Sequence, residues 1–238
     1  MESELSILKN EIQSLSNQNK SKIFQKFFKT GIGQYAEGDI FIGITVPVLR
    51  NVANKYKNID FQDLEILLNS KIHEERLISL LMLITKFNSN PENEKKCFGF
   101  YLSNLKNINN WDLVDLSAPK IIGTFLVNKP RNERELLYQL ANSESMWERR
   151  ISIVSTLSFI KNNNFKDTIG ISKILLGDKE DLIHKAVGWM LREVGKRDYN
   201  LELEFIKENY KQIPRTTLRY AIEKFQVNTR QKVLKGIF

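Results

Sequence analysis

The sequence predicts an all-α fold, arranged as a curved solenoid of stacked helical repeats with a concave basic face. Three observations lead to this prediction. Apolar residues recur with the helical period almost throughout the chain, and no convincing run alternates in the manner of a strand. In addition, four segments begin alike at nearly equal spacing, which is typical of repeat architectures.

The four similar segments begin at His73, Trp111, Trp147 and His184, at intervals of 38, 36 and 37 residues. Periods in this range are typical of stacked helical hairpins. Equivalent helices of such a stack present equivalent positions to a shared concave surface. We therefore expect the unusual side chains near the start of each segment to lie close together.

Apolar stripes predict the helices of the N-terminal half. The first stripe runs from Leu15 through Phe24 and Phe27 to Phe28. A second stripe follows Asp60, whose side chain is suited to cap a helix N-terminus. The members of this stripe and of the next are Leu64, Leu67 and Leu68, and then Leu77, Leu80, Leu81 and Ile84.

Short polar turns separate the predicted helices, at residues 88–93, 107–110, 142–145 and 177–179. None of them is long or polar enough to act as a linker between domains. The sequence therefore predicts one domain that spans residues 1–238.

Residues 30–47 form a glycine-rich exception between two helical segments. Gly31, Gly33 and Ala36 match the spacing of a dinucleotide-binding fingerprint, but no strand precedes them and no βαβ unit follows. A structural loop explains these glycines better, with Pro47 in the first turn of the next helix. The sequence leaves open whether the loop also touches a ligand.

Composition limits the function. The 42% of hydrophobic residues is ample for a core, and the single Cys97 allows no intrachain disulfide. With only two histidines, the chain lacks ligands for a zinc or iron site, so we expect no metal and no cofactor. Because no apolar stretch is long enough to span a bilayer, we expect a soluble cytoplasmic protein with no membrane contact.

The net charge of +8 favours a polyanionic partner. Six of these charges come from residues 211–238, which carry seven cations and only one anion, Glu223. Such a run is often a solvated helix face. Contacts with phosphates explain its one-sidedness better.

Trp111 and Asp115 are four residues apart and so share one face of a helix. The alternative role for Trp111 is core packing, and for Asp115 a solvated charge or an interhelix salt bridge; Asp112 fits the same alternatives. Arg150, at the fourth position of its repeat, is suited to hold a phosphate bidentately, and its alternative is an ion pair, even with Asp115 itself. The helical phase turns Trp189 away from the shared face and predicts core packing.

Four motifs together resemble the AlkD-type DNA alkylation repair family of HEAT-like repeat DNA glycosylases. They are WDLVD with SAPKIIG (111–123), MWERRISIV (146–154), HKAVGWMLREVGKRD (184–198) and GDIFIGITVPVLRNVANKY (38–56). Each motif is weak alone, but their order and spacing are fairly specific, and they cover most of the chain. The chain departs from the family at Asn109 and Asn110, where the family often has another tryptophan, and in its long glycine-rich loop.

The resemblance implies a glycosylase that excises N3- and N7-alkylated purines from double-stranded DNA. We also expect a monomer with no obligate protein partner, because a curved chain around DNA needs no second subunit. The resemblance also implies that Asp115 is catalytic, that Trp111 and Trp189 face the DNA, and that Arg150 anchors a phosphate. Further candidates for phosphate contacts are Arg149, Lys185, Arg192, Lys211 and Arg215.

The residue types suit this chemistry. An N3- or N7-alkylated purine is already positively charged, so it leaves without a general acid, and one carboxylate is enough to stabilise the sugar cation. Two alternatives remain: a non-catalytic relative that binds branched or distorted DNA, and a protein-binding scaffold, the common role of HEAT-like repeats.

Overall fold

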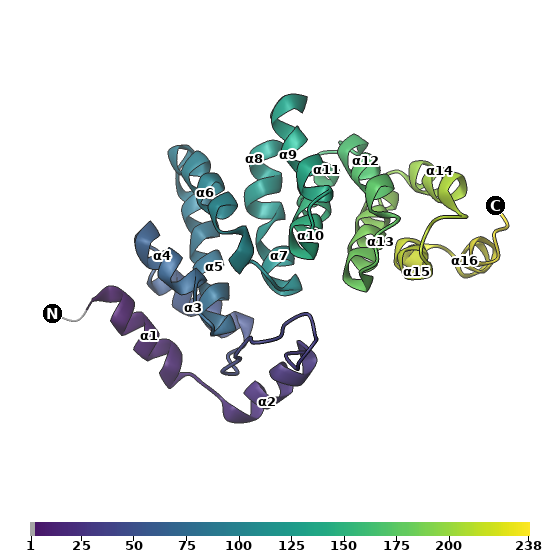
Figure 1. The fold of residues 1–238 in the computed structure, drawn as a ribbon. Helices are drawn as coiled ribbons and strands as arrows, with labels where there is room; N and C mark the ends of the chain where they lie inside the picture. The colour runs from purple at the N-terminus through teal and green to yellow at the C-terminus, as the bar shows by residue number, and fades with distance from the viewer. Residues whose placement is uncertain (1–2) are drawn as a thin grey trace. The chain divides into compact units, whose positions relative to one another are not determined.

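The computed structural model describes residues 3–238, and within them it contains helices and no β-strand (Figure 1). An isolated parallel bridge between Ile40 and Ile72 is the only β-type pairing in this part of the chain. The prediction of an all-α fold is confirmed. The chain divides into two compact units, and the boundary falls after Leu113, within helix α7 (Trp111–Ser117).

Helix α5 (His73–Ser89) is the centre of the N-terminal unit. It is buried along most of its length and packs against α3, α4 and α6. The other helices of this unit are α1 (Glu4–Ser14), α2 (Gln18–Phe27), α3 (Val46–Lys55), α4 (Phe61–Leu68), α6 (Pro91–Ser103) and the short 3-10 helix η1 (Leu105–Asn107).

Local signals set several helix ends as the sequence predicts. The carboxylate of Asp60 accepts a hydrogen bond from the Asp63 amide at 2.8 Å and caps α4. Pro47 lies in the first turn of α3. The stripe expected from Leu15 to Phe28 is interrupted, because the side chain of Asn17 accepts from the Lys20 amide at 3.0 Å and starts a new helix.

The glycine-rich loop before α3 is tied to α5 by a buried carboxylate. Glu74 accepts hydrogen bonds from the amides of Ile42, Gly43 and Ile44, at 2.8–3.2 Å. Gly43 has a φ of 87°, and a Cβ there would overlap the carbonyl oxygen of Asn17. The glycines thus have the structural role that the sequence predicts for this loop.

Helix α13 (Asp181–Gly195) is the centre of the C-terminal unit and packs against α10, α12, α14 and α15. Gly188 allows a close approach of α15, because a Cβ there would overlap the Thr217 carbonyl. The other elements are a π-helix (Pro119–Gly123), α8 (Thr124–Leu126), α9 (Arg131–Ala141), α10 (Met146–Ser155), α11 (Leu157–Lys161), α12 (Lys166–Leu175), α14 (Tyr199–Asn209), α15 (Arg215–Ala221), a 3-10 helix (Ile222–Lys224) and α16 (Val227–Leu234).

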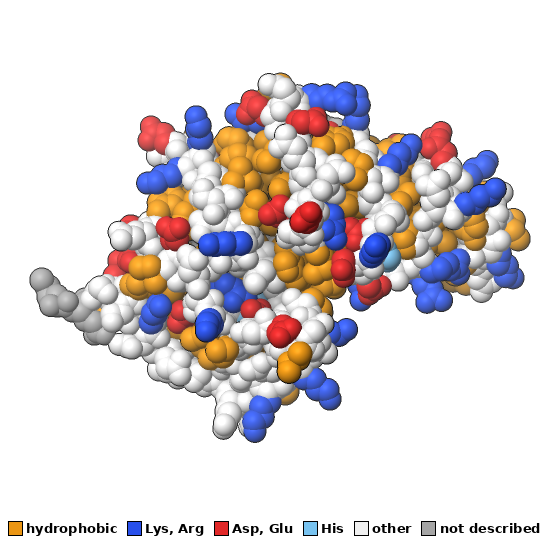
Figure 2. Space-filling model, in the orientation of Figure 1, with side chains coloured by type: hydrophobic (Ala, Val, Ile, Leu, Met, Phe, Trp, Pro, Cys, Tyr) orange, Lys and Arg blue, Asp and Glu red, His pale blue; other side chains and the backbone are white. Residues whose placement is uncertain are grey.

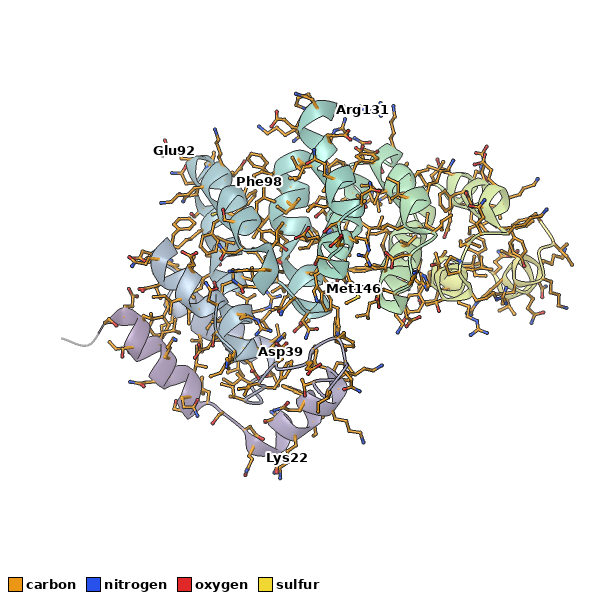
Figure 3. All side chains as sticks on the ribbon, viewed as in Figure 1. Lys22, Asp39, Glu92, Phe98, Arg131 and Met146 are labelled. Atoms are coloured by element: carbon orange, nitrogen blue, oxygen red, sulfur yellow. The ribbon has the colours of Figure 1, made fainter. Side chains whose placement is uncertain are left out.

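Polar side chains also lie inside the units. Figure 3 shows Asp39 within the N-terminal unit, whereas Lys22 points outward from α2. In the C-terminal unit, Glu202 of α14 is 2% exposed, and its Oε1 has no hydrogen-bond partner among the described residues. Burial raises the pKa of Glu202 to about 9, against a smaller lowering by the charge of Arg192.

Glu202 makes the stability of the fold depend on pH. Its folded-state pKa lies above the unfolded value of 4.5, so the folded chain binds more protons between these values. The contribution of Glu202 to stability is therefore full below pH 4.5 and is lost as the pH rises toward 9. Each pH unit in that window costs about 1.4 kcal/mol at most.

We expect Glu202→Gln to remove this dependence, because the amide mimics the protonated acid. Urea unfolding at pH 5, 7 and 9 should show a gain in the free energy of unfolding over the wild type that grows with pH. A gain that stays constant across the series would show that Glu202 is ionised in the folded state.

Candidate functional site

Asp115 and Arg150 form a bidentate ion pair in the C-terminal unit. The Nε and Nη2 groups of Arg150 donate to the two carboxylate oxygens of Asp115 at 2.9 and 2.8 Å. The Nη1 group of Arg150 donates to the Leu182 carbonyl at the start of α13. The alternative of an ion pair between Arg150 and Asp115 is thereby confirmed.

The two partners differ in their access to solvent. The side chain of Arg150 is 6% exposed, whereas that of Asp115 is 21% exposed. A buried planar guanidinium thus holds the carboxylate in one orientation, on a side chain that is not fully buried. This geometry can present an oriented negative charge to a group outside the protein, whereas Arg150 offers little surface of its own.

Trp111 stands one helical turn before Asp115 in α7, and its indole is half-buried. One face stacks on Phe28, with ring centroids 5.1 Å apart and planes 16° apart, and Phe27 meets the ring edge-on at 6.0 Å. The indole N–H donates to the hydroxyl of Tyr35 at 3.2 Å. Trp111 therefore has a packing role in the N-terminal unit, while part of the ring remains exposed.

Trp189 also is half-buried, in the middle of α13. The core packing predicted from its helical phase is thus incomplete, since part of its ring reaches the surface. The close contact between α13 and α15 is made by the preceding residue, Gly188.

Most of the other predicted phosphate contacts already have partners within the C-terminal unit. Arg149 binds Asp178 at 2.6 and 3.3 Å and two backbone carbonyls at 2.9 Å each. Lys185 pairs with Asp181 at 2.8 Å, Arg192 pairs with Glu223, and Arg215 donates to the Leu234 carbonyl at 3.0 Å. Lys211 is exposed. Of the five predicted phosphate contacts, all but Lys211 would therefore require a phosphate to compete with a partner within the protein.

Lys and Arg side chains gather over the C-terminal helices in the face shown in Figure 2. The sequence from Lys211 onward, which belongs to the C-terminal unit, has seven cations and one anion. Because charges of one sign on one surface attract a polyanion, this part of the C-terminal unit is suited to phosphates.

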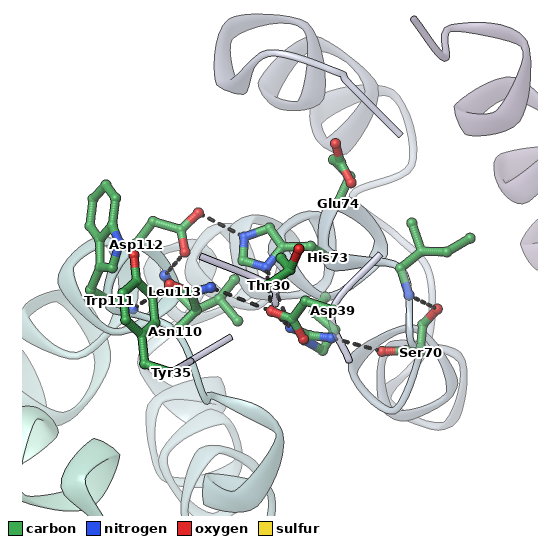
Figure 4. A network of polar contacts seen from close by, with 12 residues as sticks. Thr30, Tyr35, Asp39, Ser70, His73, Glu74, Asn110, Trp111, Asp112 and Leu113 are labelled. Atoms are coloured by element: carbon green, nitrogen blue, oxygen red, sulfur yellow. Dashed lines mark hydrogen bonds and ion pairs between the residues drawn. The ribbon is translucent and has the colours of Figure 1, made fainter. Parts of the chain in front are cut away.

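The N-terminal unit holds a buried polar network that the sequence did not predict (Figure 4). The Nε2 atom of His73 lies 2.7 Å from Asp112, and its Nδ1 atom lies 3.4 Å from Asp39. Arg76 pairs with the same Asp39 oxygen at 2.8 Å. Asp112 is therefore an interhelix partner of His73, which was one of the alternatives open for it.

The repeat register contains a signal for part of this network. Arg76 occupies the fourth position of the first repeat, as Arg150 does in the third, and each binds an aspartate that precedes it by 37 or 35 residues. The two arginine–aspartate pairs thus follow the repeat. The place of His73 between two carboxylates has no such signal.

A cavity of about 430 Å³ lies next to this network in the N-terminal unit. Its walls are almost entirely apolar and carry no lysine or arginine, so it is suited to a hydrophobic group and not to a phosphate. The lining includes Phe24, Phe28, Phe41, Leu77, His73 and Asp112.

Among residues 3–238, no group of three or more histidine, cysteine or acidic side chains is arranged to hold a metal ion. None of the helices in this range is long and apolar enough to cross a membrane.

Comparisons with known proteins agree with this architecture. The model of the DNA alkylation repair enzyme family matches residues 8–225, so the chain belongs to that family. A solved structure described as a predicted DNA alkylation repair enzyme from Enterococcus faecalis is similar in fold, with a TM-score of 0.68 and 16% identity. The match covers 89% of this chain and 97% of that chain. No curated protein matches the sequence.

The pair of Asp115 and Arg150 should contribute to stability. We expect Arg150→Gln to lower the free energy of unfolding by about 2–3 kcal/mol. This is less than the usual cost of breaking a buried ion pair, because the side chain of Asp115 is partly exposed. Urea unfolding measures the change, and Arg219→Gln, at an exposed position, is the control, with an expected change within about 0.5 kcal/mol. Equal effects of the two substitutions would contradict a stabilising pair.

Proposed function

We propose that the protein is a monofunctional DNA glycosylase that hydrolyses the N-glycosidic bond of positively charged N3- or N7-alkylated purines in duplex DNA. Membership of the DNA alkylation repair enzyme family supports a role in the repair of alkylated DNA. The observation that carries the proposal is the Asp115 carboxylate, which Arg150 fixes on a side chain that is 21% exposed.

In the proposed reaction, the bond between C1′ and the purine nitrogen breaks, and its electron pair neutralises the cationic base. The sugar becomes an oxocarbenium-like cation, which the negative charge of Asp115 stabilises. A water molecule then bonds to C1′, and its proton passes to Asp115 or to solvent. Because the leaving group carries its charge beforehand, the reaction needs neither a second carboxylate nor a metal or cofactor.

The bidentate contact with Arg150 supports this role by holding the carboxylate in a fixed orientation. A charge already oriented before the reaction requires no reorganisation when the sugar cation forms. In this proposal Arg150 acts mainly through Asp115, since its guanidinium is buried and engaged. For Arg150 to contact a phosphate as well, one of its guanidinium N–H groups would have to face the DNA.

Trp111 and Trp189 would offer ring surface to the cationic nucleotide. Each contact of a cation with an indole face contributes about 0.5–2 kcal/mol, depending on desolvation. Neither residue is fully buried, which supports this role. Since Phe28 stacks on one face of Trp111, any contact with a nucleotide would use its remaining surface.

A second candidate is a non-catalytic protein that binds distorted DNA. The specific observation in its favour is the same ion pair, because Arg150 offsets the repulsion that a bare Asp115 would exert on phosphates. This candidate predicts salt-dependent binding of DNA without release of any base.

Substitution of Asp115 separates the two candidates. We expect Asp115→Asn to slow the release of 7-methylguanine from methylated duplex by about 100-fold or more, as when a stabilising group for developing charge is removed. Single-turnover assays measure the release, and gel-shift titrations should show that binding of duplex is retained.

The matched control is Asp63→Asn, which makes the same chemical change in the first turn of α4. It should leave base release unchanged. Full activity of Asp115→Asn would remove this residue from the reaction, and no release by the wild type would favour the non-catalytic candidate.

The cationic C-terminal surface should determine how binding depends on salt. We expect Lys211→Gln to weaken binding of alkylated and unmodified duplex equally, and to reduce the slope of log K against log salt by about 0.9. Fluorescence anisotropy at several salt concentrations measures this slope. Lys57→Gln, at an exposed position of the N-terminal unit, is the control. Equal slopes for the two variants would exclude a phosphate contact at Lys211.

A further inference from the structure

His73 lies at the start of α5 and is buried among groups from three parts of the N-terminal unit. Its side chain is 2% exposed. The charged groups that face it are Asp39 from the glycine-rich loop, Arg76 from its own helix, and Asp112 from α7. Glu74, the next residue, is occupied by the amides of the loop. The ring of His73 therefore bridges the loop and the start of α7.

The network continues from these carboxylates to Trp111. Asp39 accepts from the side-chain Nδ2 of Asn110 at 3.4 Å, and the side-chain Oδ1 of Asn110 accepts from the Trp111 backbone N–H at 2.8 Å. Asp112 accepts from the backbone N–H of Leu113 at 2.9 Å. Hydrogen bonds thus link both nitrogens of the His73 ring to the first turn of α7 (Figure 4).

A column of stacked rings gives a second connection between the same residues. His73 stacks on Phe41 at 4.3 Å, Phe41 stacks on Phe28 at 4.6 Å, and Phe28 stacks on Trp111 at 5.1 Å. The interplanar angles are 24°, 16° and 16°. A change in the orientation of His73 would therefore be transmitted through tightly packed rings.

The Nδ1 atom of His73 has two competing neighbours. In the neutral ring, Nε2–H donates to Asp112 and Nδ1 accepts from Arg76, at 3.3 Å. In the protonated ring, Nδ1–H donates to Asp39 instead. Two carboxylates then face two cations, so the buried charges balance. Burial lowers the pKa of His73, but the charge of Asp112 and the hydrogen bonds to Asp112 and Asp39 outweigh it and raise that pKa above its usual value.

We propose that His73 is a positioning residue, whose protonated ring clamps Asp39 to Asp112 and so sets the first turn of α7 and the indole of Trp111. The consequence for base release rests on the proposed function, because α7 also carries Asp115. The clamp itself is a property of the free protein. When the ring loses its proton, Nδ1 no longer donates to Asp39 and accepts from Arg76 instead. The position of Trp111 is then less firmly fixed.

The test follows the side chains directly by NMR in the protein without DNA. The chain has two histidines and three tryptophans, so the ring signals of His73 can be assigned with His184→Gln and the indole N–H signal of Trp111 with Trp111→Phe. We expect His73 to titrate with a midpoint above the usual value of 6.5, and the Trp111 indole signal to move with the same midpoint. A midpoint at or below 6.5, or an indole signal that does not follow it, would overturn the proposal.

Asp112→Asn supplies the second arm. It removes one anion from the clamp, so the midpoint of His73 should move to lower pH and the Trp111 signal should lose its titration. Retention of the coupled titration in this variant would also overturn the proposal. If the variant does not fold, the wild-type titration alone decides, and the His184→Gln background excludes the other histidine as its source.

Base release gives a separate readout. The rate with methylated duplex should fall as the pH rises through the His73 midpoint, and this fall should be absent in His73→Gln but present in His184→Gln. An identical pH profile for His73→Gln and the wild type would contradict the link to activity. Absence of base release at every pH would count against the proposed function, while the NMR titration would still decide whether the clamp exists.

Discussion

The candidate site depends on one interaction, the bidentate pair between Arg150 and Asp115. An aspartate on a helix surface ordinarily moves among rotamers, and its charge is screened by water. Here the planar guanidinium fixes both oxygens at 2.8–2.9 Å, and the Leu182 carbonyl fixes the guanidinium in turn. Lysine could not make this paired contact. The result is a carboxylate that is oriented by buried groups, on a side chain that is 21% exposed.

A related arginine–aspartate pair occurs in the N-terminal unit with the opposite outcome. Arg76 contacts Asp39 through Nη2 alone, at one carboxylate oxygen, and its Nε has no partner among the described residues. Asp39 is only 8% exposed and also faces His73, so its charge is neutralised inside the protein. The comparison indicates that the repeat supplies an arginine–aspartate pair as a structural element, and that burial decides whether the aspartate is available for chemistry.

The sequence predicts the helical class and many helix ends, because periodicity and capping are local properties. Asp60 caps its helix as expected, whereas Asn17 starts a helix inside a stripe whose apolar period does not mark the break. The pair of Arg150 and Asp115 was foreseen only as an alternative. The bridge made by His73 was not foreseen, because residues that are distant in sequence meet there through packing, and no spacing rule specifies which rings and carboxylates will face each other.

The central claim is that a single oriented carboxylate suffices because the leaving base is already charged. Ordinary glycoside hydrolysis needs a second carboxyl group that acts as an acid, whereas the proposed mechanism uses Asp115 alone. The most direct test compares base release from two duplexes of one sequence, with either 7-methylguanine or the uncharged base hypoxanthine at the same position. The account predicts acceleration over the spontaneous rate for 7-methylguanine alone. Comparable acceleration for hypoxanthine would contradict it.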